Sequence, residues 1–255
     1  MKTFMPIRKY GWKKQTPDAR DIKFTPNLSL ALPEKVDLRP NFKEVYNQSA
    51  LGSCTANAIA GLIEYTTDKL DHFEFMPSRL FIYYNERDME NTVGEDSGAQ
   101  IRDGMKVVNW LGCPKEENWP YDISKFTEKP SEVAYANARQ HIVTKYEAVE
   151  QDEVHLQACL AAGKPIVFGF TVFSSFESKE VAETGMMPIP TVVEDCLGGH
   201  AVCMVGYDVE KQVYIVRNSW GKQWGDNGYF YMPFNFAHNK NMCNDFWTMD
   251  FITNH

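Results

Sequence analysis

The sequence predicts an α+β fold with two lobes and a cleft between them. Apolar residues recur with helical spacing in the first part of the chain, up to about residue 162. Beyond residue 164, short runs rich in Val, Ile, Phe and Tyr are typical of buried strands. This segregation of helices and strands is the pattern of an α+β protein. A chain of 255 residues also suits two lobes of roughly 100 residues each.

The predicted helices span 54–70, 78–90, 99–111, 131–140 and 150–162. The first is apolar nearly all round, which predicts a buried central helix. The predicted strands span 165–173, 201–207, 213–218, 229–232 and 246–252. We therefore expect a compact domain over 32–255, with a helical lobe at about 41–135 and a β lobe at about 136–250.

Residues 1–31 form a segment of different character. They are polar, contain Pro6, Pro17 and Pro26, and show no sustained periodicity. Such a pattern predicts an extended arm with little structure of its own.

Composition excludes several classes of function. The net charge is −8 and the sequence pI is about 5.3, so without a basic patch we expect no nucleic-acid partner. No run of about 18 apolar residues predicts a membrane span, and no apolar core near residue 1 predicts a signal peptide. We expect a cytoplasmic monomer, or a protein packaged in a virion if the chain is viral. Six cysteines are too few for a disulfide-built scaffold.

Metal and cofactor sites are not expected either. Cys196, His200 and Cys203 lie close together in the sequence, but no fourth ligand with suitable spacing accompanies them. No glycine-rich loop of the kind that cradles phosphates is present.

Three residues suggest nucleophilic catalysis. Cys54 lies at the predicted start of a helix, where unpaired backbone N–H groups favour the thiolate. His200 follows two glycines, which let a substrate approach closely. Asn218 ends a predicted strand, and its amide oxygen is suited to accept from a histidine N–H and fix its tautomer. Taken singly, each is more often structural: a buried thiol, a strand-edge histidine and a turn asparagine.

The combination is more specific. His200 lies 146 residues after Cys54, and Asn218 lies 18 residues further on; the papain group has its His and Asn about 130–150 residues after the cysteine. Three blocks resemble the papain family of cysteine peptidases: QSALGSCTANA, GGHAVCMVGYD and VRNSWGKQWGDNGYFYM. The resemblance runs from about residue 32 to 252 and implies a papain-like fold, with a helical left lobe, a β-barrel-like right lobe and the active-site cleft between them.

The resemblance implies a role for each matching residue. Cys54 would attack the scissile carbonyl, His200 would protonate the leaving amine, and Asn218 would orient the histidine. Gln48 would donate to the oxyanion. The residues implied in substrate binding are Ser97, Gly98, Gly199, Trp220 and, at the floor of the pocket for the side chain before the cleaved residue's own, Thr248.

The sequence also departs from the family pattern. Thr55 follows the nucleophile where many relatives have an aromatic residue, and the cysteine that would form a nearby bridge is absent. Cys196 and Cys243 are placed like another bridge of the family, so both a disulfide and two reduced thiols stay open. About 31 residues precede the domain, too few for the helical pro-segment of many relatives. This arm resembles the N-terminus of bacterial and viral members, and we expect it to pack on the enzyme, as in a zymogen with a short inhibitory propeptide.

The resemblance implies a cysteine endopeptidase that hydrolyses peptide bonds through an acyl-enzyme and prefers an apolar side chain in that pocket. Two alternatives stay open from the sequence. One is a catalytically weak relative that binds peptides in the same cleft. The other is an acyl transferase, since the same residues support transfer to an amine.

Overall fold

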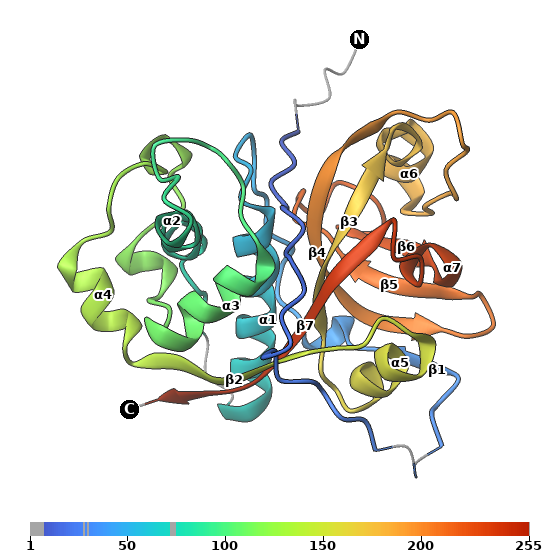
Figure 1. Cartoon of the computed structure of the whole chain (residues 1–255), viewed down its shortest axis with the longest axis horizontal. Coiled ribbons are helices and arrows are strands. Elements are labelled where there is room, and N and C mark those ends of the chain that lie inside the picture. The colour runs from blue at the N-terminus through green and yellow to red at the C-terminus, as the bar shows by residue number, and fades with distance from the viewer. Residues whose placement is uncertain (1–7, 28, 30, 72–74, 255) are drawn as a thin grey trace.

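The structure, a computed structural model, describes residues 8–27, 29, 31–71 and 75–254. The helices before residue 139 lie on one side of the molecule. Most of the twisted sheet lies on the other side together with the later helices, and the N-terminal arm runs between the two sides (Figure 1). The helices are α1 Cys54–Asp71, α2 Arg79–Met89, α3 Ile101–Trp110, α4 Glu132–Ala138, α5 Glu153–Ala161, α6 Lys179–Thr184 and α7 Phe234–Ala237. The strands are β1 Lys35–Asp37, β2 His141–Ala148, β3 Ile166–Phe173, β4 Cys196–Asp208, β5 Val213–Arg217, β6 Tyr229–Pro233 and β7 Cys243–Asn254.

Helix α1 is the central element, as its apolar sequence predicts. It packs against β4 and β7 on one side and against α2 and α3 on the other. Ala56 and Ala60 are fully buried in it, and small side chains let neighbouring elements approach closely. Because α1 contacts both sides of the molecule, its first residue, Cys54, lies where they meet.

The sheet is antiparallel throughout. Its order is β2-β7-β3-β4-β5-β6, and β1 pairs with β4. One hydrophobic cluster joins α1, α2 and α3 to the face of the sheet that α1 covers. A second cluster, rich in Phe and Trp, fills the space between the sheet and α5, α6 and α7. The α+β fold predicted from the sequence is confirmed.

Several boundaries differ from the predictions. Strand β2 is not predicted from the sequence, because Lys145 and Glu147 interrupt any apolar run and pairing along β7 stabilises the strand instead. Strands β4 and β7 begin at Cys196 and Cys243, several residues before the predicted starts, where glycine and polar residues weaken the local β signal. The short elements β1, α6 and α7 were likewise not predicted, since three to six residues give little periodicity.

The arm is extended, and its described part is tied to the domain at several points. Phe24 is buried in the second cluster, and its N–H donates to Ala148 O at 2.9 Å. Ala148 N–H in turn donates to Ile22 O at 2.7 Å. No helix within the described ranges is long and apolar enough to cross a membrane.

Candidate active site

Cys54 is the first residue of α1 and is completely buried. Hydrogen bonds from the backbone of Ala201, Gly11 and Thr55 act on its thiol. Ala201 immediately follows His200 on β4, so the contact brings the thiol beside that histidine. The predicted nucleophile and the predicted base, 146 residues apart in sequence, therefore meet between the helices and the sheet.

His200 lies on β4, and Asn218 directly follows the adjacent strand β5. His200 Nε2 and Asn218 Oδ1 are 2.8 Å apart, and both residues are buried. Asn218 Oδ1 also accepts from Ser219 N–H at 2.8 Å, which fixes the amide as an acceptor toward the ring. The other ring nitrogen, Nδ1, has no hydrogen-bond partner among the described residues. The histidine thus keeps one ring nitrogen available for proton transfer.

Trp220 covers this pair. Its ring stacks on the His200 ring with centroids 5.0 Å apart and an interplanar angle of 24°. Such a cover keeps water off the buried hydrogen bond between His200 and Asn218 and strengthens it.

Gln48 is oriented by its own amide contacts. Its Oε1 accepts from Ser219 Oγ at 2.6 Å, which directs Nε2 the other way. Nε2 donates to Leu51 O at 3.0 Å and to Lys9 O, in the arm, at 3.2 Å. Gln48 Nε2, the donor that the resemblance assigns to the oxyanion, is therefore held in a fixed orientation, and here it donates to an arm carbonyl.

The arm passes directly over Cys54. Gly11 O accepts from Ala99 N–H at 2.7 Å, and Lys13 N–H donates to Ala99 O at 3.0 Å. Trp12 N–H donates to Gly199 O at 2.9 Å, on the opposite wall. A Cβ built on Gly11 would lie only 1.7 Å from Gly52 O, so only glycine fits there. The cleft is filled by backbone that hydrogen-bonds to both walls.

Side chains of the arm also cover the histidine. The Tyr10 ring meets the His200 ring edge-on at 5.9 Å, and its hydroxyl contacts Glu177. The Arg8 guanidinium lies 3.7 Å from the centroid of the Trp220 ring. Together these contacts exclude solvent from the site.

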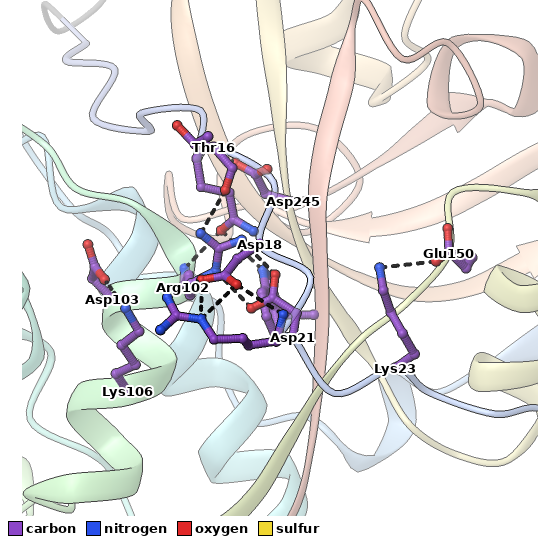
Figure 2. A network of polar contacts seen from close by, with 12 residues as sticks. Thr16, Asp18, Asp21, Lys23, Arg102, Asp103, Lys106, Glu150 and Asp245 are labelled. Atoms are coloured by element: carbon purple, nitrogen blue, oxygen red, sulfur yellow. Dashed lines mark hydrogen bonds and ion pairs between the residues drawn. The ribbon is translucent and has the colours of Figure 1, made fainter.

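Two ion pairs and a backbone contact anchor the arm further along. The Arg102 guanidinium pairs with Asp21 at 2.6 Å and donates to Thr16 O at 2.8 Å. Lys23 pairs with Glu150 at 3.0 Å. Figure 2 shows Arg102, Asp21 and Thr16 close together, with the Lys23–Glu150 pair apart from them.

Burial under the arm changes both titratable groups. Loss of solvent raises the pKa of the Cys54 thiol to about 11, although backbone hydrogen bonds from Ala201 and Gly11 act the other way. Loss of solvent also lowers the pKa of His200 to about 4, against the opposing effect of the Asn218 hydrogen bond. Near pH 7 the covered site therefore holds a neutral thiol and a neutral imidazole.

The remaining predicted site residues fall in different places. Gly98 has φ +69°, and its Cα faces Gly11, while Ala99, the next residue, makes the backbone hydrogen bonds to the arm. Ser97 Oγ donates to Thr92 and to Gly98 O within its own loop. Gly199 contacts Trp12 directly. The structure does not bring Thr248 to this group: it is buried, and its hydroxyl donates to Pro165 O at 2.8 Å.

One acidic residue beside the arm was missed from the sequence. Asp245 Oδ2 accepts from Trp12 Nε1 and from Gln15 N, each at 3.0 Å. An isolated aspartate after a polar segment gives no sequence signal, and only the path of β7 places it here.

All six cysteines are free thiols, including Cys196 and Cys243. No cluster of three or more His, Cys, Asp or Glu residues suited to a metal ion occurs within 8–27, 29, 31–71 and 75–254.

Fold and site define a class of enzyme in which a cysteine at a helix start meets a histidine on a facing strand. Residues 32–247 match the papain family of cysteine proteases, and the chain belongs to that family. It is a cysteine endopeptidase, a hydrolase that acts on peptide or protein substrates.

Individual relatives support the assignment. The chain is 41% identical over 280 aligned residues to the peptidase C1-like protein L477 of Acanthamoeba polyphaga mimivirus, covering 99% of this chain and 90% of that protein. Its structure resembles xylellain, a cysteine protease from Xylella fastidiosa, with 44% identity, a TM-score of 0.89 and coverage of 97% and 99% of the two chains. Procathepsin L 3 of Tenebrio molitor, only 18% identical, shares the fold with a TM-score of 0.72 over 91% of this chain and 75% of its own.

Thr55, where many relatives have an aromatic residue, forms a buried pair with Glu86. Thr55 Oγ1 donates to Glu86 Oε2 at 2.7 Å, and Glu86 Oε1 has no hydrogen-bond partner among the described residues. Burial raises the pKa of Glu86 well above its ordinary value. The carboxyl is accordingly neutral in the folded protein at pH values where the unfolded chain ionises it.

Glu86→Gln should therefore raise the free energy of unfolding above that of the wild type more at pH 8 than at pH 4. A raised folded pKa gives stability that is complete below the unfolded pKa and is lost as pH rises toward the folded value, at about 1.4 kcal/mol per pH unit. Gln keeps an acceptor for Thr55 but does not titrate. Urea unfolding at several pH values measures the slope.

Glu86→Ala is the comparison for this prediction. Compared with Glu86→Gln, it leaves the Thr55 hydroxyl unpaired and should cost about 1–3 kcal/mol at both pH values. A Gln variant whose stability falls with pH as steeply as the wild type would show that Glu86 is not the group responsible.

Proposed function

We propose that Cys54, His200, Asn218 and Gln48 carry out peptide hydrolysis in this chain, and that residues 8–27 of the arm hold the enzyme closed until the arm is displaced. The observation that carries the proposal is the arm backbone itself. It lies over Cys54, hydrogen-bonds to both walls of the cleft and takes a Gln48 donor.

The chemistry follows from the positions of the four side chains. With the cleft open, the Cys54 thiolate adds to the scissile carbonyl, and Gln48 Nε2 with the Cys54 backbone N–H stabilises the oxyanion. His200, protonated at Nδ1, transfers that proton to the leaving amine as the C–N bond breaks. Water, deprotonated by His200, then adds to the thioester and releases the acid and the thiol. Asn218 holds the ring in position through both steps.

The arm acts in this proposal as a blocker and not as a substrate. Trp12 bridges Ala99 in the parallel sense. The carbonyl of Gly11, the arm residue in contact with Cys54, accepts from Ala99 N–H and so points away from Gln48. Lys9 O meets Gln48 instead. Within residues 8–27, no carbonyl lies both beside the thiol and at the Gln48 donor, so this part of the arm is poorly placed for cleavage.

The proposal extends to the protein's surroundings. Six free thiols, one of them exposed on Cys196, are typical of a reducing compartment such as the cytoplasm. We take the enzyme to act there as a monomer, without nucleic acid.

The test is hydrolysis of a fluorogenic dipeptide amide, in the presence of reductant, by the full chain and by variants that open the cleft or remove the thiol. Low activity in the wild type, high activity on opening and none without Cys54 is the expected pattern. Equal activity in the wild type and the opened variant would exclude the blocking role of the arm.

A further inference from the structure

The arm places one large side chain in a pocket beside the nucleophile. Trp12 follows Gly11, the residue over Cys54, and its backbone N–H donates to Gly199 O at 2.9 Å. The indole packs on Gly169 of β3, where a Cβ would lie 1.9 Å from the ring. The wall at this point is therefore open because residue 169 has no side chain. We refer to the space that the indole fills as the Trp12 pocket.

A carboxylate lies at the end of the Trp12 pocket. Asp245 Oδ2 accepts from the indole Nε1–H at 3.0 Å and from Gln15 N–H at 3.0 Å. Both donors belong to the arm. In the part of the chain that the structure describes, Asp245 receives no other hydrogen bond, so its pairing depends on the arm being in place.

The backbone is distorted to point Asp245 this way. Asp245 has φ +62°, in the left-handed region that non-glycine residues seldom adopt. The pairing of β3 with β7 shifts here, from Val167 opposite Trp247 to Gly169 opposite Asn244. Such a bulge turns a side chain out of the regular alternation, and bulges are common beside active sites. Local strain of this kind is often retained for function.

Release of the arm would leave this carboxylate facing an empty pocket. Beside it, a cavity of about 590 Å³ lies between the arm and the domain, lined on the domain side by Arg102, Lys240 and Trp247 among others. The positive groups near Asp245 are Arg102, Lys240 and, on the arm itself, Lys14. Arg102 is the competing partner, because it loses Asp21 and Thr16 when the arm leaves.

We propose that Asp245 makes the opened enzyme prefer substrates with an arginine at one position. That position immediately precedes the residue whose carbonyl Cys54 attacks. This inference rests on the proposed function, in which the arm lies where substrate lies. An arginine side chain has an apolar stem that can pack on Gly169 and a planar group whose N–H can donate to the carboxylate. The indole of Trp12 offers the same two features, an apolar surface and an N–H donor. The guanidinium adds charge, and charge-assisted hydrogen bonds are about twice as strong as neutral ones. A purely apolar side chain would leave the carboxylate unpaired.

The experiment compares arginine with citrulline, which has nearly the same shape without the charge. Fluorogenic amides of acetyl-Xaa-Ala, with Xaa either arginine or citrulline, are hydrolysed by the full chain carrying Gly11→Ala, which opens the cleft. We expect kcat/KM to favour arginine about 10- to 100-fold, the range of a hydrogen bond to a charged group. Adding Asp245→Asn should reduce the ratio to about 1.

Asp250→Asn is the matched control. It removes the same charge from the same strand, but Asp250 pairs with Lys164 and Lys145 outside the cleft. The preference for arginine should survive that change. A ratio near 1 in the opened enzyme would overturn the proposal, and it is the result expected if Arg102 pairs with the Asp245 carboxylate. A preference for arginine that persists with Asp245→Asn would overturn it as well.

A binding measurement separates this inference from the proposed function. The full chain with Gly11→Ala and Cys54→Ala binds the same acetyl dipeptides without cleaving them, and calorimetry gives their relative Kd. Tighter binding of arginine that Asp245→Asn abolishes supports the pocket even if no variant hydrolyses peptide. Equal binding of arginine and citrulline counts against the pocket whatever the hydrolysis result.

Discussion

Gly11→Ala in the full chain should raise kcat/KM for peptide amides by about 10- to 100-fold. A Cβ at this position would lie 1.7 Å from Gly52 O and 2.5 Å from its carbonyl carbon. Gly52 has little freedom to move away, because its N–H donates to Asp96 Oδ1 at 3.0 Å. Overpacking of this kind costs about 1–3 kcal/mol, and that cost shifts the arm toward its displaced state. Initial rates across substrate concentrations give the ratio.

The change should leave the domain itself intact. Gly94→Ala is the matched control, since a Cβ there has no atom within 4 Å and the same substitution should change nothing. Thermal unfolding of the three proteins checks that folding is preserved. If Gly11→Ala and the wild type hydrolyse peptide at the same high rate, the arm does not restrict access to Cys54.

Cys54→Ala, made in the Gly11→Ala chain, should abolish hydrolysis, with a loss on the order of 10⁴-fold or more. The opened background is needed because the closed enzyme has little activity to lose. Without the thiol no acyl-enzyme forms, and Gln48 has no developing oxyanion to stabilise. Single-substrate kinetics with a fluorogenic amide measure the loss.

Cys196→Ala supplies the control for that assignment. Cys196 is the exposed thiol of the six, and the other five are buried. Its removal should leave hydrolysis unchanged. Activity that survives Cys54→Ala but disappears with Cys196→Ala would show that Cys196, and not Cys54, is the nucleophile.

The sequence predicts which residues meet at the proposed site because three of them lie in distinctive blocks. Cys54 at a helix start, His200 after two glycines and Asn218 before Ser-Trp-Gly each have a local signature. Gln48 is recognised only through the family resemblance. The structure brings His200 and Asn218 within hydrogen-bond distance and sets Cys54 against the backbone that follows His200.

The pocket could not be predicted in the same way. Thr248 was assigned to its floor by resemblance, but the structure turns this residue toward Pro165. Asp245, three residues earlier, reaches the cleft because a bulge breaks the alternation of β7. A bulge depends on pairing between distant strands, and no periodicity in β7 alone reveals it.

The path of the arm was only partly predictable. Its resemblance to the N-terminus of bacterial and viral members predicted packing on the enzyme, and the structure shows Tyr10 and Trp12 packed there. That Gly11 lies over Cys54 depends on contacts with Gly52, Ala99 and Gly199, each remote in sequence. Such contacts leave no signal within the arm except the glycine itself.

The most direct test of the closed site is the alkylation rate of Cys54 by iodoacetamide at pH 7, followed by mass spectrometry. Burial raises the pKa of this thiol to about 11, so the wild type should hold roughly one thiolate in 10⁴ molecules at that pH. We predict slow modification of Cys54 in the wild type, modification at least about 10-fold faster with Gly11→Ala, and an unchanged rate at the exposed Cys196 in both. Equally fast modification of Cys54 in the two proteins would contradict the account.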